Sequence, residues 1–135
     1  MKIVVPFESG SVEAELPEGV ETLRMRGGKA LADPASAIRE ALANPIGSAS
    51  LASIARGKKA AKAGATACVV VSDKTRPVPY RGETGILGPI LDLLGQAGFR
   101  PSEILILVAT GMHTPMTRPE LEAMLGPETL SLIHI

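Results

Sequence analysis

The stretches ACVVVSDKTRP (residues 67–77) and ILILVATGMHTP (residues 104–115) are each an apolar run followed by polar residues. Short runs of β-branched and aliphatic residues are typical of buried strands, and continuous rather than alternating apolar character favours a parallel strand that is covered on both faces. Open α/β sheets bind ligands in the crevice at the carboxyl ends of their strands. The two stretches therefore predict an α/β fold and the edge of the sheet at which a site would lie.

A helical pattern separates the two predicted strands. Residues 82–97 place apolar side chains on one helix face, and Gly98 follows as a typical stop. Gly88-Pro89 inside this pattern predicts either a kink or the true start of the helix. Strand, helix and strand at this spacing form a βαβ unit. We therefore predict an open, mostly parallel, Rossmann-like sheet with flanking helices.

The segments before this unit predict a hairpin and two helices. Residues 2–6 and 11–16 are short strands around a turn, which predicts an N-terminal β-hairpin. Asp33-Pro34 is typical of a helix start, and Asn44-Pro45 of a helix end. Residues 51–62 predict a second helix, for which a break at Gly57 is an alternative.

A further helix is predicted after the second strand. Thr117-Arg118-Pro119-Glu120 has the spacing of a capping box with Pro in the first turn, and Gly126 is placed to end the helix. We expect residues 1–129 to be the native part of this chain and to belong to a longer protein. The final LSLIHI (residues 130–135) matches one reading frame of a common sequencing adapter, so we expect a non-native tail in which His134 carries no functional weight.

Composition argues against several partner classes. Lys plus Arg and Asp plus Glu are equal at 14 each, and aromatic residues make up 2%, so neither charge nor stacking surfaces indicate a nucleic-acid partner. No apolar run reaches the roughly 20 residues that span a bilayer, and the start lacks the apolar region of a signal peptide. We therefore expect a cytoplasmic protein.

Two smaller features have ordinary structural interpretations. Cys68 is the one cysteine and lies within an apolar run, which predicts a buried structural thiol. Lys58, Lys59 and Lys62 lie near the predicted end of a helix, and we interpret them as a solvated helix end.

Three polar side chains follow the first predicted strand. Asp73, Thr75 and Arg76 are compatible with an ordinary turn and a surface arginine, and that alternative stays open from local sequence alone. Against it, Arg76 is suited to bind a carboxylate or phosphate through a bidentate fork, and Thr75 to donate to a phosphate.

A histidine follows the second predicted strand. His113 comes after Thr110-Gly111, where glycine permits a tight turn or the close approach of a ligand. If the strands are neighbours, Asp73 and His113 lie at one sheet edge, where the carboxylate would fix the tautomer of an imidazole that serves as general base. The His and Cys spacing predicts no metal site, and neither a Walker A loop nor a G-x-G-x-x-G motif is present.

At these motifs the chain resembles the lactate racemase family, specifically its N-terminal domain. The matching stretches are ANPIGS (43–48), VVSDKTRPVP (70–79) and ATGMHTPMT (109–117), in the order and spacing of the family over roughly residues 1–126. The resemblance implies an enzyme with a nickel-pincer nucleotide. It would invert small 2-hydroxy acids by removing a hydride from the chiral carbon and returning it to the other face.

The resemblance also implies roles for individual residues. His113 matches one of two acid/base histidines, Asp73 the acidic residue that supports it, and Arg76 the arginine that holds the substrate carboxylate. Thr75 and Thr110-Gly111 would lie near the cofactor. Thr114 departs from the family, in which arginine is frequent there, and this weakens a phosphate or substrate role at that position.

The family's second catalytic histidine, its tethering lysine and its nickel ligand lie further along than this chain reaches. We therefore expect the 135-residue chain by itself to be inactive. Two other interpretations stay open: a non-catalytic nucleotide- or anion-binding α/β module, and a purely structural domain whose strand-end residues only form turns.

Overall fold

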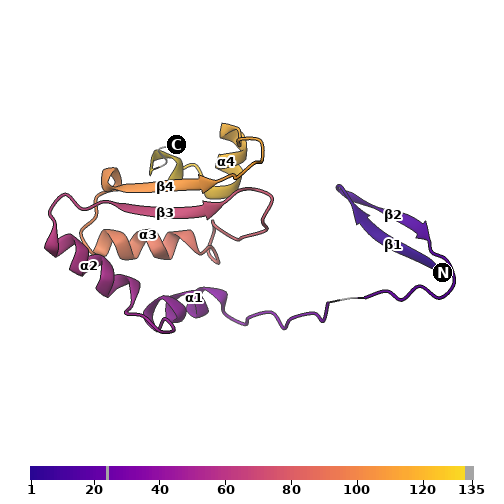
Figure 1. The fold of residues 1–135 in the computed structure, drawn as a ribbon. Coiled ribbons are helices and arrows are strands. Elements are labelled where there is room, and N and C mark those ends of the chain that lie inside the picture. Colours follow the sequence, from indigo (N-terminus) through magenta and orange to yellow (C-terminus); the bar gives the residue numbers. More distant parts are fainter. Residues whose placement is uncertain (24, 133–135) are drawn as a thin grey trace. The chain divides into compact units, whose positions relative to one another are not determined.

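The computed structural model of the protein describes residues 1–23 and 25–132, and it divides the chain into two units, Met1–Ala30 and Leu31–Ile135 (Figure 1). The elements are, in order, β1 (Lys2–Phe7), β2 (Gly10–Glu15), α1 (Pro34–Ala43), α2 (Leu51–Ala61), β3 (Ala67–Ser72), α3 (Leu87–Gln96), η1 (Pro101–Glu103), β4 (Ile104–Ala109), α4 (Arg118–Leu125) and η2 (Thr129–Leu132). Within the described ranges, no helix has the length and apolar character needed to cross a bilayer. Residues 133–135 of the predicted tail lie outside the described residues.

The N-terminal unit contains the predicted β-hairpin. β1 and β2 pair antiparallel with Val5 opposite Val12. Glu8 in the turn has a φ of +51°, the left-handed conformation that tight hairpin turns use. Val4 and Phe7 remain exposed on the strands. Because two strands alone bury little apolar surface, a hairpin of this size is at best marginally stable by itself.

Capping residues begin the first and last long helices where the sequence predicts. The Asp33 side chain accepts the Ser36 N–H at 2.9 Å, and Pro34 is the first residue of α1. Thr117 and Glu120 form the predicted capping box of α4, whose end at Gly126 has a φ of +89°. These limits are set locally, because each cap satisfies backbone N–H groups that have no acceptor inside the helix.

The two middle helices differ from the prediction in detail. α2 continues through Gly57 without a break, so the alternative of an interruption there is wrong. α3 begins at Leu87 rather than at Gly82, and residues 82–85 form a turn instead. Pro89 occupies the third position of α3, where the N–H that proline lacks would have no partner within the helix. It therefore belongs to the start of the helix and does not kink it.

β3 and β4 form the predicted parallel pair. Their register places Ala67 opposite Ile104 and Ser72 opposite Ala109, so both strands begin and end together. α3 connects them along one face (Figure 1). Among the described residues this sheet has two strands, and together with the hairpin and four α-helices it makes a mixed α/β fold.

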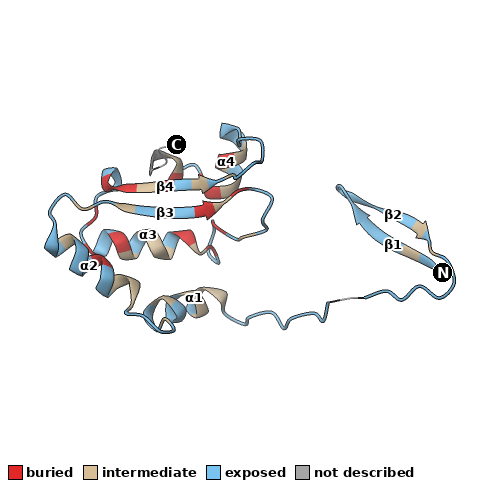
Figure 2. Ribbon diagram, in the orientation of Figure 1, coloured by how far each residue is buried: buried red, intermediate tan, exposed pale blue. Residues whose placement is uncertain are grey.

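Only one face of the β3–β4 pair is buried. Val71 and Ile106 point into a core that α3 and α4 supply through Leu87 and Leu125. On the opposite face Val70 is 62% exposed. The prediction of strands covered on both faces is therefore wrong for the described chain, because its helices pack against a single face (Figure 2).

The alternation of side chains along β3 also explains why Cys68 is exposed. Cys68 lies between two residues that pack on the core and is exposed. Successive side chains of a strand point to opposite faces, so Cys68 belongs to the uncovered face with Val70. The prediction of a buried structural thiol is wrong for this reason.

An ion-pair network joins the end of α2 to η1, which directly precedes β4. Lys59 Nζ lies 2.6 Å from Glu103 Oε2 and 4.9 Å from the centroid of the Phe99 ring. Arg100 donates to the same carboxylate through Nη2 at 2.9 Å. These contacts, first that with Arg100, lower the pKa of Glu103 to about 2. Lys59 is therefore part of the packed structure, so the interpretation of a solvated helix end is wrong for this residue, whereas Lys58 and Lys62 are exposed.

The one-sided burial of the pair predicts contrasting effects of two neighbouring residues. Ile106 is 0% exposed and Leu107 is 42% exposed. Ile106→Ala should lower the free energy of unfolding by about 2–5 kcal/mol, because it removes buried methyl groups and leaves a cavity. Leu107→Ala should lower it by less than about 1 kcal/mol. Urea unfolding followed by circular dichroism measures both, and equal losses would contradict the one-sided core.

Candidate active site

Asp73 is the first residue after β3, and its carboxylate organises the following turn. Its side chain is buried, with 3% of the residue exposed. Oδ1 accepts the Thr75 hydroxyl at 2.6 Å and the Thr75 N–H at 3.1 Å, while the Asp73 carbonyl accepts the Arg76 N–H at 3.1 Å. This is the turn chemistry that aspartate favours. The turn alternative is thus correct locally, but it uses only one of the two carboxylate oxygens.

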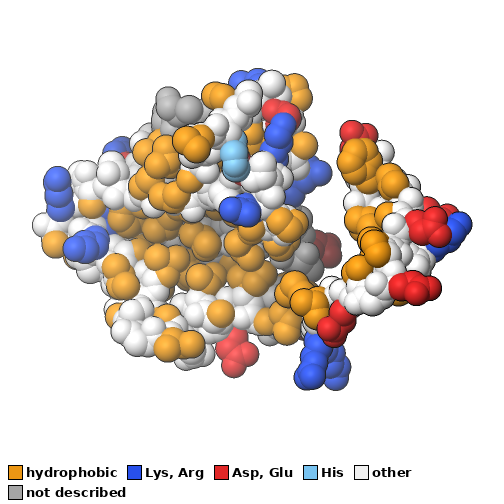
Figure 3. Space-filling view, turned by 45° about the vertical axis from the view of Figure 1, so that its right-hand side comes forward, with side chains coloured by type: hydrophobic (Ala, Val, Ile, Leu, Met, Phe, Trp, Pro, Cys, Tyr) orange, Lys and Arg blue, Asp and Glu red, His pale blue; other side chains and the backbone are white. Residues whose placement is uncertain are grey.

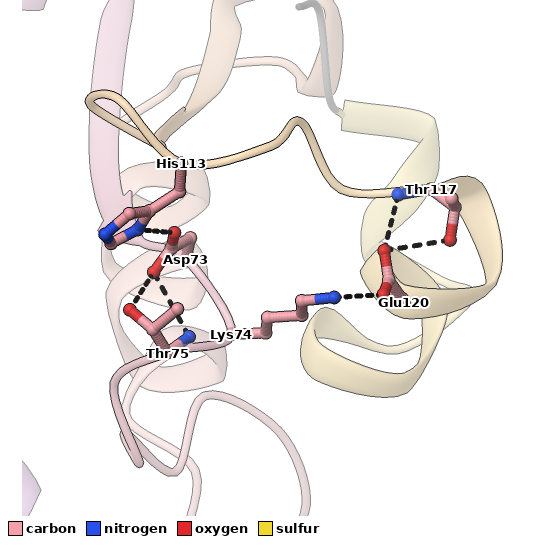
Figure 4. A network of polar contacts seen from close by, with 6 residues as sticks. All are labelled: Asp73, Lys74, Thr75, His113, Thr117 and Glu120. Atoms are coloured by element: carbon pink, nitrogen blue, oxygen red, sulfur yellow. Dashed lines mark hydrogen bonds and ion pairs between the residues drawn. The ribbon is translucent and has the colours of Figure 1, made fainter.

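The other oxygen faces the loop that follows β4. His113 Nδ1 lies 2.5 Å from Asp73 Oδ2 (Figure 4). Gly111 has a φ of +58°, and the His113 N–H donates to the Thr110 carbonyl at 3.0 Å, so a tight turn brings His113 back toward β3. The parallel register, which ends both strands at the same edge, accounts for a contact across 40 positions of sequence. The predicted Asp73–His113 pair is confirmed.

The charge of Asp73 determines which nitrogen of the His113 ring carries a proton. Hydrogen bonds from the Thr75 hydroxyl and from His113 lower the pKa of Asp73 from 3.8 to about 2, although burial acts in the opposite direction. The carboxylate is therefore ionised at neutral pH and accepts, so Nδ1 carries a proton. A neutral ring then has its lone pair on Nε2. Nε2 has no hydrogen-bond partner within residues 1–23 and 25–132.

The remaining predicted residues lie on the same two loops. Thr75 directs its hydroxyl proton to Asp73, which leaves the oxygen as an acceptor. Arg76 is exposed, with no acidic partner for its guanidinium in the described part of the chain. Thr110 is half-buried, and a Cβ added to Gly111 would meet no atom within 4 Å, so the backbone is open to a ligand there. Contact of these four residues with substrate or cofactor stays a prediction.

Two contacts at this edge are absent from the sequence prediction. The Tyr80 hydroxyl accepts the Ser72 N–H at 2.8 Å and lies 2.7 Å from the Ser72 hydroxyl, which holds the chain after Arg76 against the end of β3. Lys74 forms an ion pair with Glu120 of α4. Tyr80 is the one tyrosine of the chain and follows a proline-rich turn, a weak signal in itself, and nothing local links Lys74 to Glu120.

Neither a metal site nor the cleft between the helices coincides with the predicted site residues. Among the described residues, no cluster of three or more His, Cys, Asp or Glu side chains is placed to ligate a metal ion. A cleft of about 470 Å³ between α1, α2 and α3 contains none of the predicted site residues. Figure 3 shows the histidine at the margin of an exposed hydrophobic area of the second unit, with basic side chains near it.

The lowered pKa of Asp73 predicts a pH dependence of stability. Because the folded pKa lies below 3.8, the stabilisation from the ionised carboxylate is complete above that value and is lost as the pH falls toward about 2. The difference in unfolding free energy between the wild type and Asp73→Asn should therefore shrink as the pH falls from 3.8 toward about 2. Urea unfolding at a series of pH values measures this, with Glu122→Gln as control for the loss of one charge. A difference that does not vary with pH would contradict it.

Comparison with known proteins connects this geometry to one family. The sequence model described as "Lactate racemase N-terminal domain" matches residues 7–135. The chain is similar to the lactate racemase of Thermoanaerobacterium thermosaccharolyticum, with 31% identity over 132 residues, and to that of Lactiplantibacillus plantarum, with 37% identity over 94 residues. These alignments cover 93% and 70% of this chain, but 28% and 20% of the relatives.

A solved structure agrees with the sequence comparisons. The lactate racemase apoprotein from Thermoanaerobacterium thermosaccharolyticum matches with a TM-score of 0.67 and 28% identity, over 100% of this chain and 30% of that one. The chain thus spans less than a third of the length of the relatives that it matches. Since the family match includes both strand-end loops and nearly all of the remaining sequence, the chain belongs to the lactate racemase N-terminal domain family.

Proposed function

We propose that this chain is the N-terminal part of a nickel-pincer nucleotide-dependent racemase or epimerase of small 2-hydroxy acids. The observation that carries the proposal is the 2.5 Å contact between His113 Nδ1 and Asp73 Oδ2, which leaves Nε2 as a proton acceptor at the carboxyl edge of the strands. Relatives named lactate racemase support the substrate class. They do not favour the alternative of a non-catalytic nucleotide- or anion-binding module.

In the proposed reaction, the residues of this chain bind the substrate and move a proton. His113 Nε2 takes the proton of the hydroxyl group of one enantiomer as the bond from the chiral carbon to hydrogen breaks, and returns it in the reverse reaction. A second histidine, outside these 135 residues, would serve the opposite enantiomer. Asp73 holds the ring orientation and stabilises the imidazolium. Arg76 binds the substrate carboxylate through two parallel hydrogen bonds. The bound nucleotide supplies the hydride acceptor.

The described residues fit one side of such a cofactor. Thr110 and Gly111 lie at the strand edge beside His113, and open space over Gly111 suits the close approach of a nucleotide. Thr75 offers an acceptor oxygen on the neighbouring loop. From the resemblance to the family, we propose that the nickel ligand and the tethering lysine belong to a part of the protein outside these 135 residues. We further propose that β3 and β4 belong to an open, mostly parallel, Rossmann-like sheet in the complete protein.

The first test is the complete gene. Sequencing the source DNA through the codons after Thr129 shows whether the reading frame continues with a lysine and two further histidines. Such a frame supports the racemase, and its protein can then be loaded with cofactor and assayed. A gene that ends at Ile135 would contradict the proposal for this chain.

His113 should be required for racemisation by that complete protein. His113→Ala should lower kcat by about 10²–10⁴-fold, because a positioned general base contributes an effect of that size. Conversion of one lactate enantiomer into the other, followed by chiral chromatography, measures it. Thr114→Ala is the matched control on the same loop and should retain activity. Racemisation by the 135-residue chain alone would refute the expectation that this chain is inactive by itself. An undiminished kcat in His113→Ala would refute the assigned role of His113.

Arg76 should act mainly through substrate binding. Arg76→Lys keeps the positive charge but loses the planar fork that binds a carboxylate through two hydrogen bonds. We expect KM for lactate to rise by about tenfold or more, since one charge-assisted hydrogen bond is worth about 1.5–3 kcal/mol. Arg81→Lys, a matched change beyond the turn, should leave KM unchanged. Equal effects of the two substitutions would contradict the role of Arg76.

A further inference from the structure

The two loops of the candidate site touch at a second point, away from His113. Lys74 follows Asp73 directly, and its ammonium group forms an ion pair with Glu120 in the first turn of α4 (Figure 4). The same Glu120 side chain accepts the Thr117 N–H at 2.7 Å and the Thr117 hydroxyl at 3.0 Å. Glu120 thus joins the loop after β3 to the point where the loop after β4 enters a helix.

Backbone pairing does not reach these loops. The ladder between β3 and β4 ends at Ser72 and Ala109. Residues 110–117 contain no helix or strand, and the turn-closing backbone hydrogen bond with both ends in this segment joins His113 N–H to the Thr110 carbonyl. The path of the loop beyond His113 is therefore determined by where its far end is held, at the start of α4.

The start of α4 is a fixed anchor for this loop. Leu121 and Leu125 are 6% and 1% exposed, so α4 is packed on the core. The pKa of Glu120 is lowered to about 2, first by Lys74 and then by Thr117, so the group is ionised at neutral pH. An isolated surface ion pair contributes little. Here, however, Glu120 accepts from three donors at once, and two of them belong to a helix cap that forms independently of Lys74.

We propose that Lys74 and Glu120 are positioning residues, whose ion pair holds the loop after β4 against the loop after β3 and so keeps His113 Nδ1 on the Asp73 carboxylate with Nε2 directed outward. The inference rests on the proposed function, because an outward Nε2 matters only if it receives a proton from a substrate. Neither residue needs to touch the substrate. The effect passes through the position of His113.

The test separates this role from a simple effect of charge. His113 is one of the two residues whose hydrogen bonds lower the pKa of Asp73, so loss of the contact raises that pKa toward 3.8. Lys74→Met removes a positive charge near Asp73, and charge alone would also raise the pKa. Glu120→Gln removes a negative charge, so charge alone would lower it. Glutamine still serves in a capping box, so α4 keeps its start.

The readout is the titration of Asp73 in the 135-residue chain, followed through its side-chain carboxyl carbon by NMR. We expect the pKa of Asp73 to rise in both Lys74→Met and Glu120→Gln, and to stay at the wild-type value in Lys74→Arg, which retains the ion pair. Glu122→Gln is the matched control. It removes the same charge from the same helix but breaks only the pair with Arg118, at 3.2 Å.

If the pKa of Asp73 shifts in opposite directions in Lys74→Met and Glu120→Gln, charge alone explains the effect and the proposal is overturned. An unchanged pKa of Asp73 in both variants would also overturn it. If the complete protein racemises lactate, both variants should lower kcat by about two- to tenfold with KM nearly unchanged, because they leave Arg76 in place. Titration shifts without any racemisation by the complete wild-type protein would leave the positioning role standing and refute the proposed function. The two failures are therefore distinguishable.

Discussion

The parallel register of β3 and β4 is the constraint on which the site depends. It ends the strands together, at Ser72 and Ala109, and so places the loops that carry Asp73 and His113 at one edge. An offset of one residue would turn every side chain of a strand to the opposite face, so the buried residues that set the register also set the site. Ile106, which has no exposed surface, is the centre of that buried set. Packing of the core and geometry of the site therefore have the same origin.

The geometry of the site also depends on the burial of the Asp73 carboxylate. Removing a charge from water is costly unless hydrogen bonds replace the lost solvation. Thr75 supplies two such bonds from the adjacent turn, and His113 supplies the third from across the sheet edge. The turn residues alone would satisfy one oxygen of the carboxylate. The histidine is needed for the other, which explains why a half-exposed ring occupies one defined position.

Much of the local structure follows from short-range physics. The caps at Asp33 and Thr117, the hairpin and the two strands form where the sequence predicts, because each depends on hydrogen bonds or side-chain alternation within a few residues. The prediction is wrong where the sequence signal is ambiguous, or where elements distant in the sequence decide which side chains are buried. The pattern of residues 82–86 predicts the first turn of α3, whereas the helix begins at Leu87 and a turn precedes it. Exposure of Cys68 depends on which face the helices cover, and a continuous apolar run does not carry that information.

The type of each element and the residues that follow each strand can be read from the amino-acid sequence. It also contained the motifs that mark the family, including Asp73 and His113. Three contacts follow from the packed fold alone: the 2.5 Å contact between these two side chains, the hydrogen bond of Tyr80 at the end of β3, and the ion pair of Lys74 with Glu120. The reason is physical. Periodicity and caps report interactions between near neighbours, whereas a contact across 40 residues forms only once the core has aligned the strands that carry its partners.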